Sequence, residues 1–293
     1  MVERATTTTT HLARRLGWTF LGILLLAATV CLLIMLMHFC RHYGGLIRPG
    51  RSYVLDGVHH TLPKLPSDTP LGLYPVIKDS LAAQIKDMFM RFQRVCIAHG
   101  MDMWLAGGTL LGYVRHQGFI PWDDDMDLHM KLADKAQLLG AAVRTDLERE
   151  GLALVRVTNF WRTDMVKVVA LRTGAGGGTA ERLSTYPFLD VLFEGRAPDG
   201  SWGTCADAVQ SRDVMCQALH PREQWNEDDI FPLQDGTFEN LPVRVPHRPV
   251  NVLEAQYGKR VLRSYHVDFV HWIIHFAAVQ RFPVWPSAGM SIA

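Results

Sequence analysis

The sequence lacks an excess of either charge. Its 293 residues include 30 Lys and Arg against 29 Asp and Glu, which gives a formal net charge of +1. A surface that binds nucleic acid needs a basic excess, because phosphate contacts supply most of the binding free energy. The balance argues against a dedicated nucleic-acid-binding protein, so we expect no nucleic-acid partner. Hydrophobic residues make up 48% of the chain, which argues against wholesale disorder.

Cysteine is scarce, and no Cys-x-x-Cys pair occurs, which argues against a structural zinc site. Two of the five cysteines, Cys31 and Cys40, lie in or beside an apolar run. The other three are an odd number, so they cannot form a complete disulfide framework. Cys205 and Cys216 could form one bridge in an oxidising compartment, and the sequence leaves this open. The chain also lacks the Gly-x-Ser-x-Gly nucleophile motif and the His-Glu-x-x-His zinc helix.

An apolar run at residues 18–39 contains no Asp, Glu, Lys or Arg. As a helix these 22 residues would be about 33 Å long, close to the roughly 30 Å of a bilayer core. A cleaved signal peptide has a shorter apolar region, followed by small residues. We therefore predict an uncleaved, single-pass signal anchor after a short tail at residues 1–17. Three arginines lie on each side of the run, so charge does not decide the orientation.

The remainder of the sequence predicts a linker and then one α/β domain. Residues 40–75 are rich in proline and show no hydrophobic period, so we expect a stem. Apolar steps of three and four predict helices over residues 80–99 and 132–147. Strand-like segments occur at residues 103–106, 152–157, 166–171 and 188–193. We expect a mixed sheet in a domain at residues 76–262, then a C-terminal helix and tail at 263–293.

Four acids lie close together at positions 123, 124, 125 and 127. Residues i and i+2 of a strand share a face, so Asp125 and Asp127 point the same way while Met126 and Leu128 face the core. Such a pair can bind one hard cation. A solvated acidic loop is the alternative, but crowded carboxylates repel one another unless a cation is present.

Two further features accompany these acids. The turn Gly107-Gly108-Thr109 follows a strand, and its backbone could approach a phosphate closely. A tight turn without a ligand is the other interpretation. Asp190 lies within the apolar segment FLDVLF, and a buried carboxylate needs a partner or a metal. It could complete a metal site, act as a base toward an acceptor hydroxyl, or bond to core groups.

Residues 104–127, WLAGGTLLGYVRHQGFIPWDDDMD, resemble the signature of the LicD family. That family includes phosphocholine transferases and, more distantly, fukutin and fukutin-related proteins, which transfer ribitol phosphate. FLDVLF at 188–193 and LEAQYG at 253–258 resemble later family segments, so the resemblance extends over about residues 80–260. The family tends to have a proline near the position of Glu194, which this chain lacks.

The resemblance implies a nucleotidyltransferase-like fold with the glycine turn beside the Asp-x-Asp strand. It implies an enzyme that transfers a phospho-alcohol from a CDP-linked donor to a hydroxyl of a glycan or glycoprotein, with Mg²⁺ or Mn²⁺, and releases CMP. Anchored members resemble type II proteins of the Golgi membrane, which places the catalytic domain in the lumen. Neither the transferred alcohol nor the acceptor can be identified from the sequence.

Each candidate residue then has an expected role. Asp125, Asp127 and Asp190 are expected as catalytic metal ligands. Gly107, Gly108, Thr109 and Arg115 are expected to bind the donor phosphate, although Arg115 could instead form a salt bridge with the acids. Two other functions stay open: a Golgi glycosyltransferase that binds a nucleotide-sugar through the Asp-x-Asp site, and a non-catalytic anchored scaffold with the same fold.

Overall fold

The computed structural model describes residues 2–64, 73–158, 164–172, 182–197, 200–204 and 224–263. The chain divides into two compact units, Met1–Tyr43 and Gly44–Ala293. Cys205, Cys216 and all but the first residue of the expected C-terminal helix and tail lie outside the described residues.

The first unit is a single long helix, α1 (Val2–His42). Its segment Trp18–His42 is long and apolar enough to cross a membrane, although a signal sequence can have the same properties. Leu25, Leu32 and Met37 are each more than 60% exposed, as expected for side chains that face lipid. The helix also includes residues 2–17, where we expected an irregular tail. No proline interrupts these residues, and threonine costs only a few tenths of a kcal/mol per helical position.

The expected stem at residues 40–75 is a folded part of the second unit for most of its length. The described part contains the hairpin of β2 (Ser52–Leu55) and β3 (Val58–Thr61), and β1 (Tyr43–Ile47) pairs with β4 (Tyr74–Ile77). The linker prediction was wrong because Asp56-Gly57 is a two-residue hairpin turn. Both residues have positive φ, 46° and 78°, as this turn requires.

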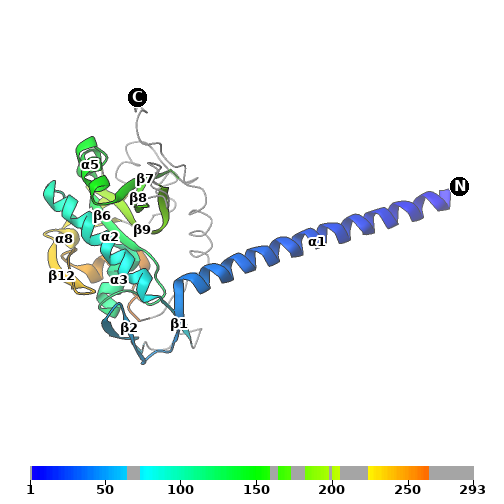
Figure 1. The fold of residues 1–293 in the computed structure, drawn as a ribbon, viewed down its shortest axis with the longest axis horizontal. Coiled ribbons are helices and arrows are strands. Elements are labelled where there is room, and N and C mark those ends of the chain that lie inside the picture. The colour runs from blue at the N-terminus through cyan, green and yellow to red at the C-terminus, as the bar shows by residue number, and fades with distance from the viewer. Residues whose placement is uncertain are drawn as a thin grey trace. The chain divides into compact units, whose positions relative to one another are not determined.

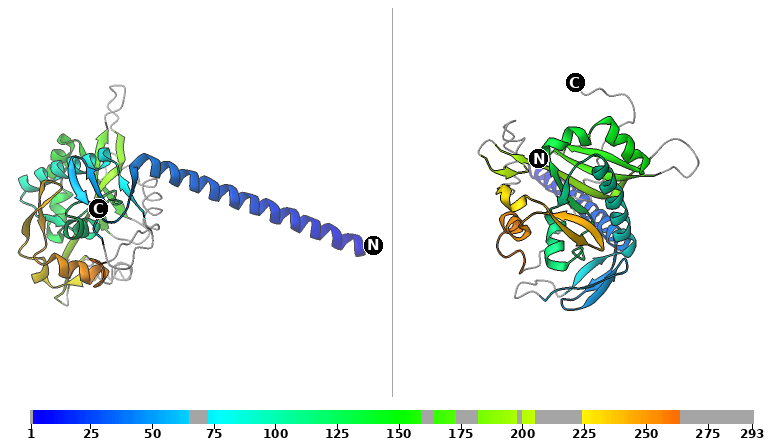
Figure 2. Two further views of the ribbon diagram at one scale, coloured as in Figure 1. Left: turned by 90° about the horizontal axis from the view of Figure 1, so that it is seen from below. Right: turned by 90° about the vertical axis from the view of Figure 1, so that its left-hand side faces the viewer.

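A buried side-chain contact joins this hairpin to a second hairpin, β12 (Gln234–Phe238) with β13 (Leu241–Val245). Figure 2 shows the two hairpins as ribbons. The Nε2 atom of His60 on β3 lies 3.2 Å from Oε2 of Glu239, which follows β12. The other carboxylate oxygen of Glu239 accepts a hydrogen bond of 2.8 Å from the backbone N–H of Phe119. His60 and Glu239 are both more than 90% buried, so the β2–β3 hairpin is part of the domain core.

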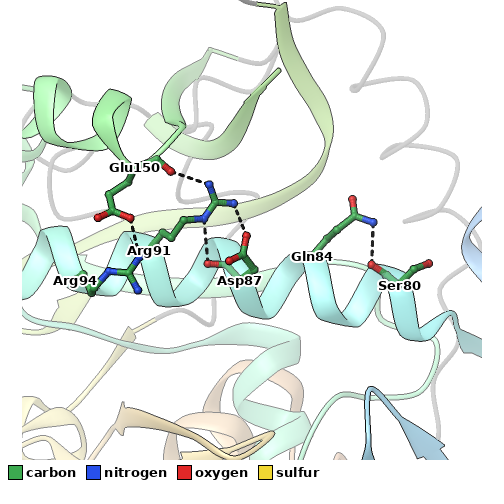
Figure 3. Close-up of polar contacts among 6 residues, drawn as sticks. All are labelled: Ser80, Gln84, Asp87, Arg91, Arg94 and Glu150. Carbon is green, nitrogen blue, oxygen red and sulfur yellow. Dashed lines mark hydrogen bonds and ion pairs between the residues drawn. The ribbon is translucent and has the colours of Figure 1, made fainter. Parts of the chain in front are cut away.

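The predicted helix at residues 80–99 is α2 (Asp79–Ala98), and its expected apolar face is buried. Figure 3 shows the polar contacts along its other side. Arg91 donates through Nη1 to the backbone carbonyl of Glu150 at 2.7 Å, and Arg94 contacts the carboxylate of Glu150 at 2.7 Å. Glu150 directly follows α5 (Ala141–Arg149), so these contacts tie α2 to α5.

The second predicted helix, at residues 132–147, is not continuous. It consists of a 3-10 turn (Leu132–Asp134), α4 (Lys135–Leu138) and α5. The break lies at Gly140, whose extended backbone begins α5. The helical period continues across the break, which is why periodicity alone predicted one helix.

The central sheet has seven strands and confirms the mixed α/β class (Figure 1). β9 (Arg182–Arg196) pairs with β6 (Met126–Lys131), β8 (Asp164–Arg172) and β10 (Trp202–Gly203). The outer strands are β5 (Met103–Leu105) beside β6, β7 (Leu152–Thr158) beside β8 and β11 (Gln224–Trp225) beside β10. Only the pair β6–β9 is parallel among the described strand pairs of this sheet.

Three further helices complete the described fold. α3 (Gly107–His116) follows β5, α8 (Glu227–Ile230) follows β11, and α9 (Pro249–Tyr257) follows β13. α2 packs on β8 and β9, whereas α3 packs against β6 and α9. α3 begins at the glycine pair itself.

Candidate active site

Three adjacent strands place three charged residues in one row across the sheet. Asp190 on β9 is paired with Asp127 of parallel β6 on one side and with Lys167 of antiparallel β8 on the other. Residues directly opposite each other on neighbouring strands point to the same face of a sheet. The register therefore brings together side chains that are far apart in the sequence.

Asp125 joins this row from the residues just before β6. One carboxylate oxygen from each of Asp125, Asp127 and Asp190 lies within 4.8 Å of the other two. Asp125 is 2% exposed and Asp190 is 6% exposed, whereas Asp127 is half-buried. We call these three residues the carboxylate cluster. The structure thus brings together the three acids that the sequence suggested as metal ligands.

Two more acids lie beside the carboxylate cluster. Burial raises the pKa of Asp123 well above its ordinary value, and the nearby charges of Asp125, Asp127 and Asp124 raise it further. Asp124 is buried and accepts a hydrogen bond of 2.8 Å from the hydroxyl of Tyr186. The site therefore concentrates negative charge in a place with little water, an arrangement that favours cation binding.

The glycine pair allows α3 to begin directly against Asp127. Gly107 has a φ of +48°, and a Cβ atom there would lie 2.4 Å from Oδ2 of Asp127. The backbone N–H of Gly108 donates to the same oxygen at 2.8 Å. A side chain at position 107 would collide with the carboxylate, so glycine is required here by Asp127 itself.

The first turn of α3 also fixes the backbone of β6. The N–H of Asp127 donates to the hydroxyl oxygen of Thr109 at 2.8 Å, and the N–H of Ala106 donates to the carbonyl of Asp127 at 3.1 Å. The partial positive charge at a helix N-terminus stabilises a nearby carboxylate. The glycine turn and the Asp-x-Asp strand thus lie side by side, as the family resemblance implied.

Sequence reasoning missed Lys167. Its Nζ atom lies 2.5 Å from Oδ1 of Asp190 and 3.3 Å from the ring centroid of Phe188. Lys167 is 3% exposed, and lysine is almost never buried to this extent without a partner. The signal was a single lysine inside the apolar segment VKVVAL at 166–171, which matches the single acid inside FLDVLF.

A second buried polar network on the same sheet was also missed. His129 lies two residues beyond Asp127, and its Nδ1 atom contacts a carboxylate oxygen of Glu194. The other oxygen of Glu194 accepts a hydrogen bond of 2.7 Å from the indole N–H of Trp202. Glu194 is fully buried, and both of its carboxylate oxygens have partners in this network.

Arg115 lies at the other end of α3 from the glycine pair. It lies in the last turn of α3, about 12 Å along the helix axis from Gly107. Its Nη1 atom donates to the backbone carbonyl of Val261 at 2.9 Å. The expected contact of Arg115 with the donor phosphate stays a prediction.

Comparison with known proteins places this domain in a family. Residues 100–248 match the family model described as LicD/FKTN/FKRP, nucleotidyltransferase domain. The match spans about half of the chain and contains the whole carboxylate cluster. The chain belongs to the LicD family.

Individual relatives differ in how much of this LicD-family chain they match. The lipopolysaccharide cholinephosphotransferase LicD of Haemophilus influenzae is 51% identical over 39 residues, which is 13% of this chain and 15% of that protein. The human ribitol 5-phosphate transferase FKRP is 44% identical over 57 residues, 18% of this chain and 12% of FKRP.

A longer match is to mannosyltransferase regulator 4 of Saccharomyces cerevisiae. It is 38% identical over 193 residues, which is 64% of this chain and 15% of the yeast protein. This chain therefore spans no more than 15% of the length of any of these three relatives. The named members associate the family with phosphoryl-alcohol transfer.

Proposed function

We propose that this protein transfers a phosphorylated alcohol, such as phosphocholine or ribitol phosphate, from a CDP-linked donor to a hydroxyl of a glycan or glycoprotein. The observation that carries the proposal is the carboxylate cluster of Asp125, Asp127 and Asp190, at the N-terminus of α3. Membership of the chain in the LicD family supports the reaction class, because named relatives are a cholinephosphotransferase and a ribitol 5-phosphate transferase.

The carboxylate cluster fits a hard divalent cation. Three oxygens within 4.8 Å of one another need only small side-chain movements to share one ion, and Mg²⁺ and Mn²⁺ prefer oxygen ligands. We assign Asp125, Asp127 and Asp190 as the residues that would hold it. A bound cation would neutralise charge on the diphosphate of the donor and orient it for transfer.

The protein's own groups then position the reactants. The acceptor oxygen forms a bond to the phosphorus that carries the alcohol, the bond from this phosphorus to the bridging oxygen breaks, and CMP leaves. The hydroxyl proton passes to water. Such transfers depend mainly on positioning and charge neutralisation. The N-terminal amides of α3 around Gly107 and Gly108 would support the donor phosphate beside the acids.

The remaining expected residues take different roles in this proposal. The hydroxyl of Thr109 already accepts from the N–H of Asp127, and Thr109 is 2% exposed, so we assign it support of Asp127. Asp190 contacts Lys167 and lies directly opposite Asp127 on the neighbouring strand, so we assign it metal binding in place of base catalysis.

We further propose that α1 anchors the protein in a membrane of the secretory pathway, with the domain in the Golgi lumen. The apolar segment Trp18–His42 supports the anchor. A glycan acceptor supports the lumen, where glycans are assembled. A protease-protection assay on sealed vesicles tests the orientation: the domain should resist protease until detergent is added.

A second candidate function is regulation without catalysis. The yeast relative over 193 residues is named a mannosyltransferase regulator, so a LicD-like domain can occur in a protein named for control of another enzyme. In that case the carboxylate cluster would bind a cation or nucleotide without turnover. The buried, closely spaced acids favour the enzyme, because three carboxylates are costly to retain without a cation.

The test uses the full chain in detergent with Mg²⁺ or Mn²⁺ and pooled glycan acceptors. CDP-choline, CDP-ribitol, CDP-glycerol, UDP-sugars and GDP-sugars are supplied in turn, and release of CMP, UDP or GDP is measured. We expect cation-dependent CMP release from one CDP donor. Release of UDP or GDP would indicate a glycosyltransferase, and donor binding without turnover would favour the regulator.

A further inference from the structure

A positively charged side chain of the protein lies beside the carboxylate cluster. Lys167 contacts Asp190 at 2.5 Å, and both side chains are more than 90% buried. In the row across β8, β9 and β6, Asp190 lies between Lys167 and Asp127. The ammonium therefore lies at one edge of the cluster, on the side opposite the N-terminus of α3.

The position of Lys167 is fixed by packing as well as by charge. Its ammonium lies over the ring of Phe188, which is two residues before Asp190 on β9 and shares its face. Cation–π contact stabilises a desolvated ammonium. With a ring on one side and a carboxylate on another, Lys167 has little freedom to leave the cluster.

The charges suggest what this lysine does. Asp125, Asp127 and Asp190 carry three negative charges when ionised, and Lys167 supplies one positive charge. Lys167 therefore offsets part of the negative charge of these acids, to which the neighbouring Asp123 and Asp124 add, and a divalent cation would offset more of it. Opposite charges in a poorly hydrated site interact strongly, so this balance controls both metal affinity and stability.

We propose that Lys167 is the resident counter-charge of the carboxylate cluster. It holds the acids together when no metal is bound, and it lowers the affinity of the cluster for a divalent cation. This inference rests on the proposed metal site, and it concerns a residue that the proposed reaction does not itself require. Lys167 touches Asp190 and acts through it, so it is a positioning residue.

The response of Lys167 variants to Mn²⁺ distinguishes this role from that of an ordinary ion pair in the core. In Lys167→Met the buried carboxylate of Asp190 loses the ammonium that it contacts, so the melting temperature should fall by roughly 6–20 °C. Mn²⁺ should then restore more stability than it adds to the wild type. The variant should also bind Mn²⁺ at least about threefold more tightly, because a repelling charge is gone. Lys167→Arg keeps the charge and should behave like the wild type.

A matched control is available on the same sheet. Lys131 on β6 forms an ion pair with Asp102 at 3.1 Å, outside the carboxylate cluster and partly exposed. Lys131→Met should leave the response to Mn²⁺ unchanged. The measurements use the full chain in detergent: tryptophan-detected melting with and without Mn²⁺, and titration of Mn²⁺ followed by electron paramagnetic resonance.

The outcomes separate this inference from the proposed function. A larger Mn²⁺ effect in Lys167→Met than in the wild type and Lys131→Met supports the counter-charge, whether or not CMP release is found. Equal Mn²⁺ effects in all three, or weaker Mn²⁺ binding in Lys167→Met, would overturn it while leaving the transferase in place. If Mn²⁺ neither binds nor stabilises any of them, the metal site and this inference both fail.

Discussion

Replacement of Gly107 by alanine tests how the carboxylate cluster is built. Two separate penalties are expected from the structure. Alanine at a φ of +48° costs about 1–2 kcal/mol from backbone strain alone. Its Cβ atom would also lie 2.4 Å from Oδ2 of Asp127, so the carboxylate must move.

Movement of Asp127 breaks the hydrogen bond of 2.8 Å from the N–H of Gly108. A hydrogen bond to a charged group contributes about 1.5–3 kcal/mol. Gly107→Ala should therefore lower the free energy of unfolding by about 2.5–5 kcal/mol in total. Because Asp127 is displaced, the variant should also lose most of the stabilisation by Mn²⁺.

Gly100 provides the matched control. It has a φ of +68°, and a Cβ atom there would have no neighbour within 4 Å. Gly100→Ala should show only the strain, about 1–2 kcal/mol, and a normal response to Mn²⁺. Urea denaturation and melting with and without Mn²⁺ measure both effects. Equal destabilisation and equal Mn²⁺ responses in the two variants would refute the assignment of Gly107 to the support of Asp127.

Three further predictions concern neighbouring parts of the structure. Thr109→Val removes the acceptor for the N–H of Asp127 and should cost about 1–3 kcal/mol in urea denaturation, whereas Thr109→Ser should cost much less. Burial, with the charges of Arg115 and then His60, lowers the pKa of His116 to about 2. As pH falls below about 6.5, His116 therefore takes up a proton in the unfolded chain but not in the folded one. The free energy of unfolding should then decrease by about 1.4 kcal/mol for each pH unit because of this residue, with no such loss above pH 6.5. His116→Gln should lack this part of the slope between pH 6 and 5, and equal slopes would contradict the assignment. Glu239→Ala should cost about 3–5 kcal/mol because it leaves His60 and the N–H of Phe119 without their acceptor; a cost below 1 kcal/mol would show that the β2–β3 hairpin is not held by this pair.

Much of the fold was predictable where one physical signal dominates. The apolar face of α2 and the alternation along β6 were both read correctly, because burial of a regular face sets the period of hydrophobic residues. The isolated acid in FLDVLF correctly indicated a buried carboxylate at Asp190. The family resemblance added that β5, α3 and β6 form one unit around the glycine turn.

Other features depended on contacts that sequence spacing does not contain. Lys167 could not be assigned to Asp190, because their pairing depends on the register of β8 with β9. The role of Gly107 depends on the approach of Asp127 in space, 20 positions along the chain. The contact of Arg115 with the carbonyl of Val261 likewise joins residues 146 positions apart.

The β2–β3 hairpin was missed for a different reason. The prolines of residues 40–75 suggested a linker, although the Asp56-Gly57 turn between two short alternating segments was a local hairpin signal. Its anchor, the contact of His60 with Glu239, joins residues 179 positions apart. The proline content of this segment predicted a linker, whereas the Asp56-Gly57 turn and the contact of His60 with Glu239 determine its structure.

The most direct test of the central claim is CMP release by the double variant Asp125→Asn/Asp127→Asn. Its control is Asp87→Asn/Asp235→Asn, which removes two exposed acids of the same domain, with side chains 56% and 94% exposed. With the active CDP donor, Mn²⁺ and a glycan acceptor, the control should release CMP at the wild-type rate. The cluster variant should lose at least about a hundredfold in rate, since the metal and donor would no longer be held. Undiminished CMP release by a folded cluster variant would contradict the account.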